Sequence, residues 1–140
     1  MMKIISETLQ FSTKGYGDIV DVSEDVSEKL SGTGMRDGLA TVFVPGSTGG
    51  FTTIEHESGL VKDFTAMMER LIPQNVRYHH DARWGDGNGF SHVRAALLGP
   101  SLTVPFSGGR LSLGTWQQII FVDFDNRRRS RNIILQFMGE

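Results

Sequence analysis

The sequence predicts one α+β domain over residues 1–140, with a mostly antiparallel sheet and two or three helices packed against it. Short β-branched segments separated by glycine-rich turns fill most of the chain, and each is typical of a strand. Only a few segments carry apolar residues at helical spacing. A length of 140 residues with 39% apolar and 21% charged residues is ordinary for one folded domain.

The first half of the chain is predicted to hold four strands and two helices. Ser23 and Ser58 are placed to act as N-caps, and an apolar stripe follows each of them at helical spacing. Pro73 ends the second helix. The strands are predicted at residues 3–12, 19–22, 38–45 and 51–55.

The second half is predicted to hold a short helix, Ser91–Leu98, followed by a meander of strands. Residues 126–130 form the last hairpin loop of this meander. Trp116 begins the longest strand, and we expect it in the core or at an interface. These strands are predicted at residues 102–106, 110–113, 115–124 and 132–138.

The composition excludes several classes of function. The net charge of -2 gives no basic field, so nucleic acid is not a favoured partner. The chain has no cysteine, which excludes thiolate metal sites and cysteine nucleophiles and fits a cytoplasmic protein. We see no signal peptide and no apolar run near the ~20 residues that span a bilayer, so no membrane partner is expected.

Side chains that can bind a metal or transfer a proton are concentrated between Tyr78 and His92. This segment holds three of the four histidines, two aspartates and an asparagine, broken by glycines that let the backbone fold back. Imidazole and carboxylate groups bind divalent metals or move protons near neutral pH. The segment is therefore the first place to look for a functional site.

The histidines allow two interpretations. His79 and His80 point to opposite faces of an extended chain, so one of them is expected to join His92. A metal site would then need a carboxylate from Glu55, Asp81 or Asp86 as a third ligand. The alternative is a hydrogen-bonded loop with a satisfied histidine.

Glu55 stands at the end of a predicted strand, where a carboxylate can act as a general base or metal ligand. Phe51 and Thr53 share its face of the strand, which suggests partial burial. On the long strand, Gln117 is a candidate polar group facing a pocket.

The turn 46–50 can form an anion-binding nest, to which Ser47 and Thr48 add hydroxyl donors. It is not a Walker motif, because no lysine follows and a strand comes next. The alternative is a hairpin turn that needs glycine for positive φ. The arginines at 127–129 and 131 favour a solvated turn over a nucleic-acid patch, although they can also bind phosphate or a neighbouring subunit.

The segment Leu111–Ile119, LSLGTWQQI, resembles the signature of the YjbQ-like family, which is often described as secondary thiamine-phosphate synthase-like. The resemblance runs from about residue 38 to 140. It implies a compact α+β fold, a tight homotrimer and a polar pocket where a metal or anions bind. The counterparts of the pocket residues are Glu55, His80, Asn88 and His92.

One departure from the family matters. Many members read Pro-His-Thr-Thr after the third strand, whereas this chain has Gly46 in place of the histidine. A metal site of three histidines is therefore not assembled in the usual way. A carboxylate, His79 or His56 takes the place of the missing ligand, or this branch binds no metal tightly.

The resemblance implies a small-molecule transferase that joins a pyrimidine diphosphate to a thiazole phosphate with loss of pyrophosphate. The alternative is a non-catalytic ligand- or metal-binding trimeric module. The expected partners are a phosphorylated small molecule and two further copies of the chain, with a divalent metal, Zn or Mg, as cofactor. The predicted residues are Glu55, His80 and His92 for catalysis, His80 and His92 for metal, and Ser47, Thr48, Asn88 and Gln117 for ligand.

Overall fold

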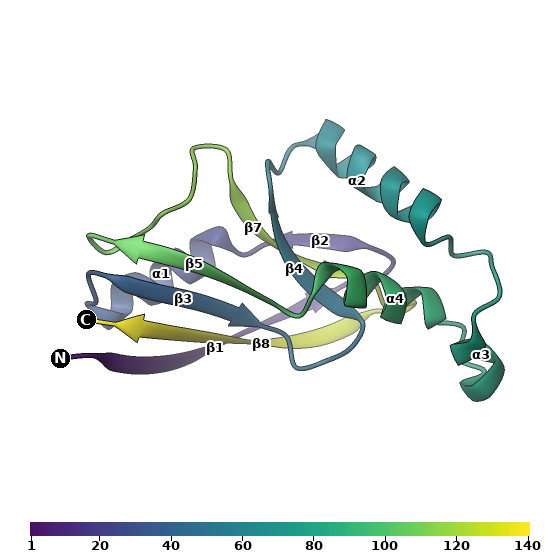
Figure 1. The fold of residues 1–140 in the computed structure, drawn as a ribbon, viewed down its shortest axis with the longest axis horizontal. Coiled ribbons are helices and arrows are strands. Elements are labelled where there is room, and N and C mark those ends of the chain that lie inside the picture. The colour runs from purple at the N-terminus through teal and green to yellow at the C-terminus, as the bar shows by residue number, and fades with distance from the viewer.

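A computed structural model describes residues 1–140 and confirms the α+β class (Figure 1). The strands form two antiparallel sheets, one with five strands in the order β1-β8-β3-β5-β6 and one with three in the order β2-β7-β4. The strands are β1 (Lys3–Thr13), β2 (Asp18–Asp21), β3 (Gly38–Phe43), β4 (Gly49–Ile54), β5 (Ser101–Ser107), β6 (Arg110–Leu111), β7 (Gln118–Asp123) and β8 (Arg129–Gly139).

Four helices accompany the sheets, one more than expected. They are α1 (Ser23–Thr33), α2 (Ser58–Leu71), α3 (His79–Trp84) and α4 (Gly89–Leu98). The additional helix, α3, lies in the segment predicted to be extended and turn-rich. None of the four is long and apolar enough to cross a membrane.

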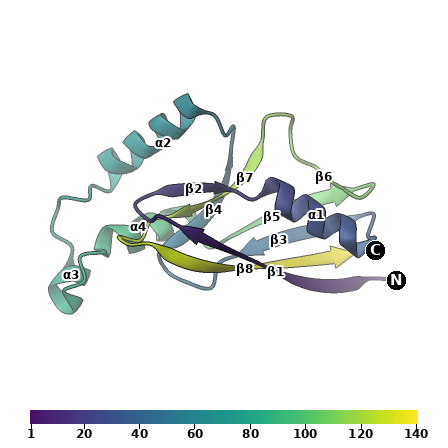
Figure 2. The ribbon, with the colours of Figure 1, turned by 180° about the vertical axis from the view of Figure 1, so that it is seen from behind.

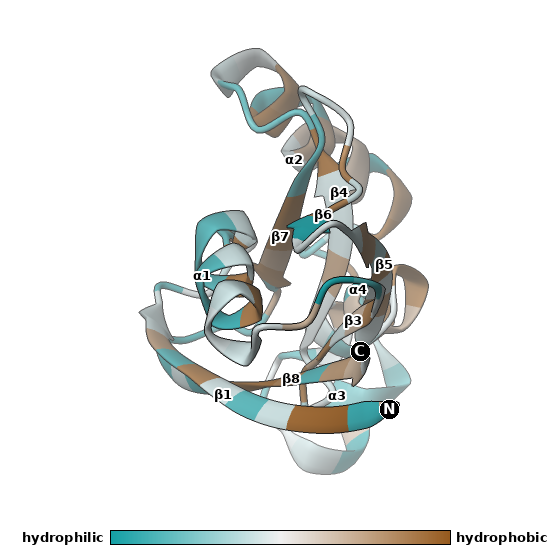
Figure 3. Ribbon diagram, turned by 90° about the vertical axis from the view of Figure 1, so that its left-hand side faces the viewer, coloured by the Kyte–Doolittle hydropathy of each residue, from teal (hydrophilic) through white to brown (hydrophobic).

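The strand β7 lies between two apolar clusters. Ile119 and Phe121 belong to the main core, whereas Ile120 and Val122 belong to a smaller cluster with residues of α2 and α4. A strand buried on both faces has a continuous apolar sequence, which is why this segment has no alternation. The helix α1 contributes Val26 and Leu30 to the main core and lies within the curve of β1 and β8 (Figure 3).

The predicted meander at the C-terminus is wrong in one respect. The β5–β6 hairpin is present, but β7 pairs with β2 and β4 while β8 pairs with β1 and β3. Residues 124–128 therefore connect one sheet to the other instead of closing a hairpin, and residues 129 and 130 already belong to β8. The predicted strand 115–124 is also too long, because residues before Gln118 form an exposed loop.

Both N-caps lie one residue before the predicted serine, at Val22 and Glu57. Ser23 is instead the first helical residue of α1, and its Oγ accepts a hydrogen bond from the Ile119 N–H at 2.8 Å. Ser58 is likewise inside α2, because the carboxylate of Glu57 caps this helix. That carboxylate accepts hydrogen bonds from two N–H groups of the first turn, where negative charge also suits the helix dipole.

The register of β4 against β7 separates two ends of the molecule. Gly49 pairs with Asp123 at one end, and Ile54 pairs with Gln118 at the other. The first end meets the turn after β3 and the start of α4. The second end leads into the loop before β7, which projects from the body far from α3 (Figure 2).

Candidate functional site

A cavity of about 450 Å³ opens at the Gly49–Asp123 end of the second sheet. Four segments form its walls: the turn after β3, the α3–α4 loop, the first turn of α4, and the β7–β8 connection with the start of β8. None of the lining residues is hydrophobic. They are Gly46, Ser47, Thr48, Asp86, Asn88, His92, Asp125, Asn126, Arg127, Arg129 and Arg131.

A buried ion pair forms the floor of the cavity. Arg131 is 4% exposed and binds Asp123 through two hydrogen bonds, Nε–Oδ2 at 2.7 Å and Nη2–Oδ1 at 2.8 Å. The same Nη2 donates to Thr48 Oγ1 at 2.8 Å, and the Thr13 hydroxyl donates to Asp123 at 2.6 Å. This leaves Nη1 of Arg131 free to face the turn after β3.

The turn residue Gly46 gives this guanidinium its space. A Cβ at position 46 would lie only 3.2 Å from Nη1 of Arg131. A side chain here would therefore crowd the free N–H groups, so glycine keeps this wall of the cavity open.

Asp125 is the second buried carboxylate and is 2% exposed. It accepts hydrogen bonds from the Asn126 N–H at 2.8 Å, from the Asn88 amide at 3.2 Å and from Arg129. Burial alone would raise the pKa of Asp125, but these hydrogen bonds and the Arg129 charge together hold it below its ordinary value of 3.8. The carboxylate is therefore ionised at neutral pH and fixes Asn88 and Arg129 in place.

Arg127 differs from the other two arginines of the cavity because its side chain makes no hydrogen bond or ion pair. Its backbone is held against the 13–17 segment, where Gly15 has φ of 74° and leaves no room for a Cβ beside the Arg127 carbonyl oxygen. The position of this arginine is thus fixed while its guanidinium stays available.

The predicted convergence of His80 and His92 is confirmed, since their ring centroids are 4.4 Å apart. The reason differs from the one expected. His79 and His80 lie in the helix α3, where successive side chains diverge by about 100°. His79 is exposed, whereas His80 is half-buried beside α4.

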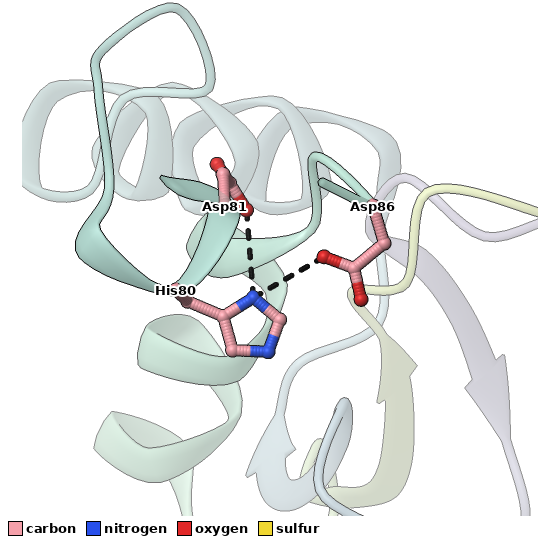
Figure 4. A group of neighbouring side chains, drawn as sticks. All are labelled: His80, Asp81 and Asp86. Atoms are coloured by element: carbon pink, nitrogen blue, oxygen red, sulfur yellow. Dashed lines mark hydrogen bonds and ion pairs between the residues drawn. The ribbon is translucent and has the colours of Figure 1, made fainter. Parts of the chain in front are cut away.

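Two carboxylates complete a candidate metal centre around His80 (Figure 4). Its Nδ1 lies 3.3 Å from Asp86 Oδ1 and 3.5 Å from Asp81 Oδ1, and one ligand atom from each residue falls within 4.8 Å of the others. Asp81 Oδ1 also accepts a hydrogen bond from the Gly89 N–H at 2.8 Å, which orients it at the start of α4. The expected substitute ligands Asp81 and Asp86 are therefore brought together with one histidine.

Three of the four predicted ligand-binding residues, Ser47, Thr48 and Asn88, line the cavity. The Oδ1 of Asn88 is buried and has no hydrogen-bond partner. Its Nδ2 is committed to Asp125, so the orientation of the amide is set by that hydrogen bond. An orphan acceptor at the edge of a polar cavity can bind a hydroxyl, a water or a cation.

Within one chain, the structure does not bring Glu55 or Gln117 to this cavity. Glu55 is exposed and follows the far end of β4, so the length of β7, roughly 16 Å for five residue steps, separates it from the cavity. The Gln117 side chain is used locally, donating to Thr53 Oγ1 at 3.1 Å and accepting from the Gly114 N–H at 3.0 Å. The sequence alone does not show which strand ends lie at the same end of a sheet, because that depends on how the strands pair.

Asp123 and Asp125 escaped prediction, and the arginines at 129 and 131 were assigned to a solvated turn, with phosphate binding as the alternative. The sequence did hold an indication of the arginines. Arg129 and Arg131 occupy the same alternation as the buried apolar residues of β8, so they point into the protein instead of lying on a solvated turn.

The fold and the cavity together define a class: a small α+β protein with an all-polar pocket, walled by arginines and placed beside two convergent histidines. A family model described as UPF0047 protein YjbQ-like matches residues 7–140. The chain belongs to the UPF0047, YjbQ-like family.

Relatives of the chain span almost its whole length. A UPF0047 protein of Archaeoglobus fulgidus is 39% identical over 126 residues, covering 90% of this chain and 96% of the relative. A UPF0047 protein of Bacillus subtilis is 32% identical over 134 residues, covering 95% and 98%.

Solved structures agree on the fold. A YbjQ-like protein of unknown function from Sulfolobus solfataricus has a TM-score of 0.94 and 29% identity, with all of both chains covered. A hypothetical protein from Aeropyrum pernix has a TM-score of 0.84 and 35% identity, covering 96% of this chain and 99% of that one. The predicted fold and family are thereby confirmed.

Proposed function

We propose that the cavity binds a phosphorylated small molecule together with a divalent cation, and that the chain is an enzyme resembling the secondary thiamine-phosphate synthases. One observation carries the proposal. The cavity brings three arginines and the 46–48 turn together with His92, and the ring centroid of His92 lies 4.4 Å from that of His80. Guanidinium groups, hydroxyls and backbone N–H groups are the donors that phosphate binds in proteins.

The arginines have different roles in this proposal. Arg131 is held rigidly by Asp123, so its free Nη1 is oriented before any ligand arrives. Arg127 has no internal partner and can move to the ligand. A rigid donor beside a mobile one favours an anion with several oxygen atoms, such as a diphosphate.

The polar lining also indicates which part of a ligand enters. Pockets that hold aromatic rings present apolar and aromatic side chains, and this cavity presents none. The diphosphate of a pyrimidine precursor therefore fits the cavity, while the heteroaromatic rings lie at its mouth or outside it. Charge on a departing diphosphate would be stabilised by the arginines that already face it.

The residues around His80 fit a divalent cation. They offer one imidazole and two carboxylates, a mixed set that suits zinc or magnesium, and His92 lies beside them. A cation bound there would supply further positive charge against the diphosphate. The set needs no histidine at position 46, because Asp81 and Asp86 provide the additional ligands. The imidazole of His92 is the group best placed to carry a proton to or from a ligand in the cavity.

A second candidate function is a binding module without catalysis. The position of Glu55 favours it, since the carboxylate expected to act as a base lies at the other end of β7. Both candidates share the ligand, so binding alone does not separate them. Turnover of the two thiamine precursors, measured with wild type and with His92→Ala, separates them.

We further propose the homotrimer that the family resemblance implies. A loop that exposes 72% of Trp116 and an uncovered sheet face support self-association of so small a domain.

The binding proposal is tested by calorimetric titration of pyrophosphate into the protein with Mg²⁺ present. Arg127→Gln removes a cavity guanidinium that has no structural partner, and Arg128→Gln is the matched control because its neighbouring side chain does not line the cavity. A charged hydrogen bond is worth about 1.5–3 kcal/mol, so Arg127→Gln should weaken binding by at least about tenfold. Arg128→Gln should leave the affinity unchanged. Equal affinities for all three proteins would contradict the proposal.

A further inference from the structure

A second cavity of about 210 Å³ adjoins the polar cavity, between the first residues of β4 and the helix α4. Gly46, Ser47 and His92 line both cavities, so the two spaces share a boundary. The function proposed above uses only the polar cavity and leaves this adjoining space without a role. Its remaining walls are Gly49, Ala95, Ala96 and Pro100.

The two cavities differ in charge. Three arginines and two aspartates line the polar cavity, whereas no arginine, lysine or carboxylate lines the second one. Beyond the three shared residues, the second cavity offers a proline ring, two methyl groups and a glycine backbone. A phosphate group placed there would lose water without gaining a cation, which costs free energy. An uncharged, partly apolar group suits this space instead.

Small side chains on one face of α4 keep the second cavity open. His92, Ala95 and Ala96 have the i, i+3, i+4 spacing that places residues on the same side of a helix. Ala95 is buried, but Ala96 is exposed. Leucine forms helices nearly as well as alanine, so the stability of α4 does not require a methyl group at position 96.

Backbone contacts fix the wall that α4 contributes. The Val44 N–H donates to the Pro100 carbonyl at 2.9 Å, and the Phe51 N–H donates to the Gly99 carbonyl at 3.0 Å. A Cβ at Gly50 would lie 2.7 Å from that Gly99 oxygen, so glycine lets α4 come close to β4 (Figure 1). The second cavity is therefore formed before any ligand arrives, as small-molecule sites commonly are.

We propose that the second cavity holds the ring of a phosphate or diphosphate ester of a one-ring alcohol, which rests on the function proposed above. The phosphate groups of this ligand lie among the arginines of the polar cavity, and His92 lies at the boundary between them and the ring. An apolar cavity of about 150 Å³ in another protein holds one benzene molecule, so the space here accommodates a single small ring. Ala96 then determines specificity, because its small size leaves room for the ring.

The test compares two ligands of equal charge by calorimetric titration with Mg²⁺ present. Benzyl diphosphate carries a ring, and methyl diphosphate has the same ester linkage without one. Ala96→Leu fills the second cavity, and Ala66→Leu is the matched control, because Ala66 is an exposed alanine of α2 that lines neither cavity. Circular dichroism and melting temperature check that both variants keep the fold.

Wild type should bind benzyl diphosphate at least about tenfold more tightly than methyl diphosphate, since even one methylene in an apolar pocket changes affinity by about that factor. Ala96→Leu should remove this advantage and leave the affinity for methyl diphosphate unchanged. Ala66→Leu should keep both wild-type affinities.

Three outcomes would overturn the inference while the phosphate site stands: equal affinities of wild type for the two esters, an advantage that Ala96→Leu leaves intact, or an equal loss of both affinities in that variant. Failure of wild type to bind pyrophosphate and both esters would overturn the proposed function and this inference together. If Ala96→Leu does not fold, Ala96→Met is read against Ala66→Met in the same way.

Discussion

The buried charges beneath the cavity are the feature that separates this chain from an ordinary β-sheet protein. Arg131 and Asp123 are almost entirely removed from water and bind each other. Arg131 also donates to the Thr48 hydroxyl, and Asp123 accepts from the Thr13 hydroxyl. Such a pair adds little net stability compared with apolar residues, but losing one partner leaves a costly unpaired charge. Its use here is to hold a guanidinium at a fixed place in the cavity wall.

Asp125 makes the stability of the cavity depend on pH. Its pKa is lower folded than unfolded, so its contribution to stability is present above about pH 4 and is lost as the pH falls through the folded pKa. We expect Asp125→Asn to destabilise the protein at pH 7 and the difference in unfolding free energy from wild type to narrow as the pH falls below about 4, through the folded pKa. Urea unfolding at a series of pH values measures this gap. A gap of constant size over that range would show that the carboxylate charge is not what stabilises the site.

At the scale of single residues, the sequence predicted what depends on residue type and missed what depends on pairing. The convergence of His80 and His92 was expected from strand alternation at 79–80 and from the family resemblance, and it holds although residues 79 and 80 lie in a helix. Glu55 was misplaced because a strand end has no fixed neighbours until its register is known. Arg131 was taken for a surface residue because arginine is seldom buried, although its alternation with Ile133 pointed inward.

At the scale of elements, the segment 13–17 supports the cavity from behind. The N–H groups of Tyr16 and Gly17 donate to the carbonyls of Asp125 and Asp123, each at 2.7 Å. This turn therefore sets the path of the β7–β8 connection and, with it, the position of Arg127.

Two glycines of this turn allow that support to be tested. Gly15 and Gly17 both have positive φ, 74° and 84°, but only at Gly15 would a Cβ collide with the 125–127 backbone. Both alanine variants should lose roughly 1 kcal/mol of stability from backbone strain, and Gly15→Ala should lose more. Only Gly15→Ala should weaken pyrophosphate binding, because it displaces Arg127. Equal pyrophosphate affinities of the two variants would show that this turn does not position Arg127 for binding.

Most of the strands and helices were predictable because each has a local pattern. The alternation of β1 and β8 and the helical stripes of α1 and α2 needed no tertiary information. The helix α3 was missed because its six residues are too few to show a period. The division of β7 and β8 between two sheets was missed because pairing partners are set by the global packing of both faces of β7.

At the scale of the whole molecule, the pocket and the outer face of the five-stranded sheet lie on opposite sides of the same strand, β8. Its inward residues include Arg129 and Arg131, and its outward residues include Ile134 and Gln136. Strand alternation thus places the arginines of the cavity and the outward side chains of β8 on opposite faces of the sheet. The net charge of -2 does not show that three arginines line one cavity, together with Asp86 and Asp125.

A crystal structure with pyrophosphate and Mn²⁺ tests the central claim most directly. We expect diphosphate density within hydrogen-bond distance of Arg127, Arg129 and the free Nη1 of Arg131, and an anomalous peak beside His80 and Asp86. Density for the diphosphate elsewhere on the molecule, with only water in the cavity, would contradict the proposal that this pocket binds a phosphorylated ligand.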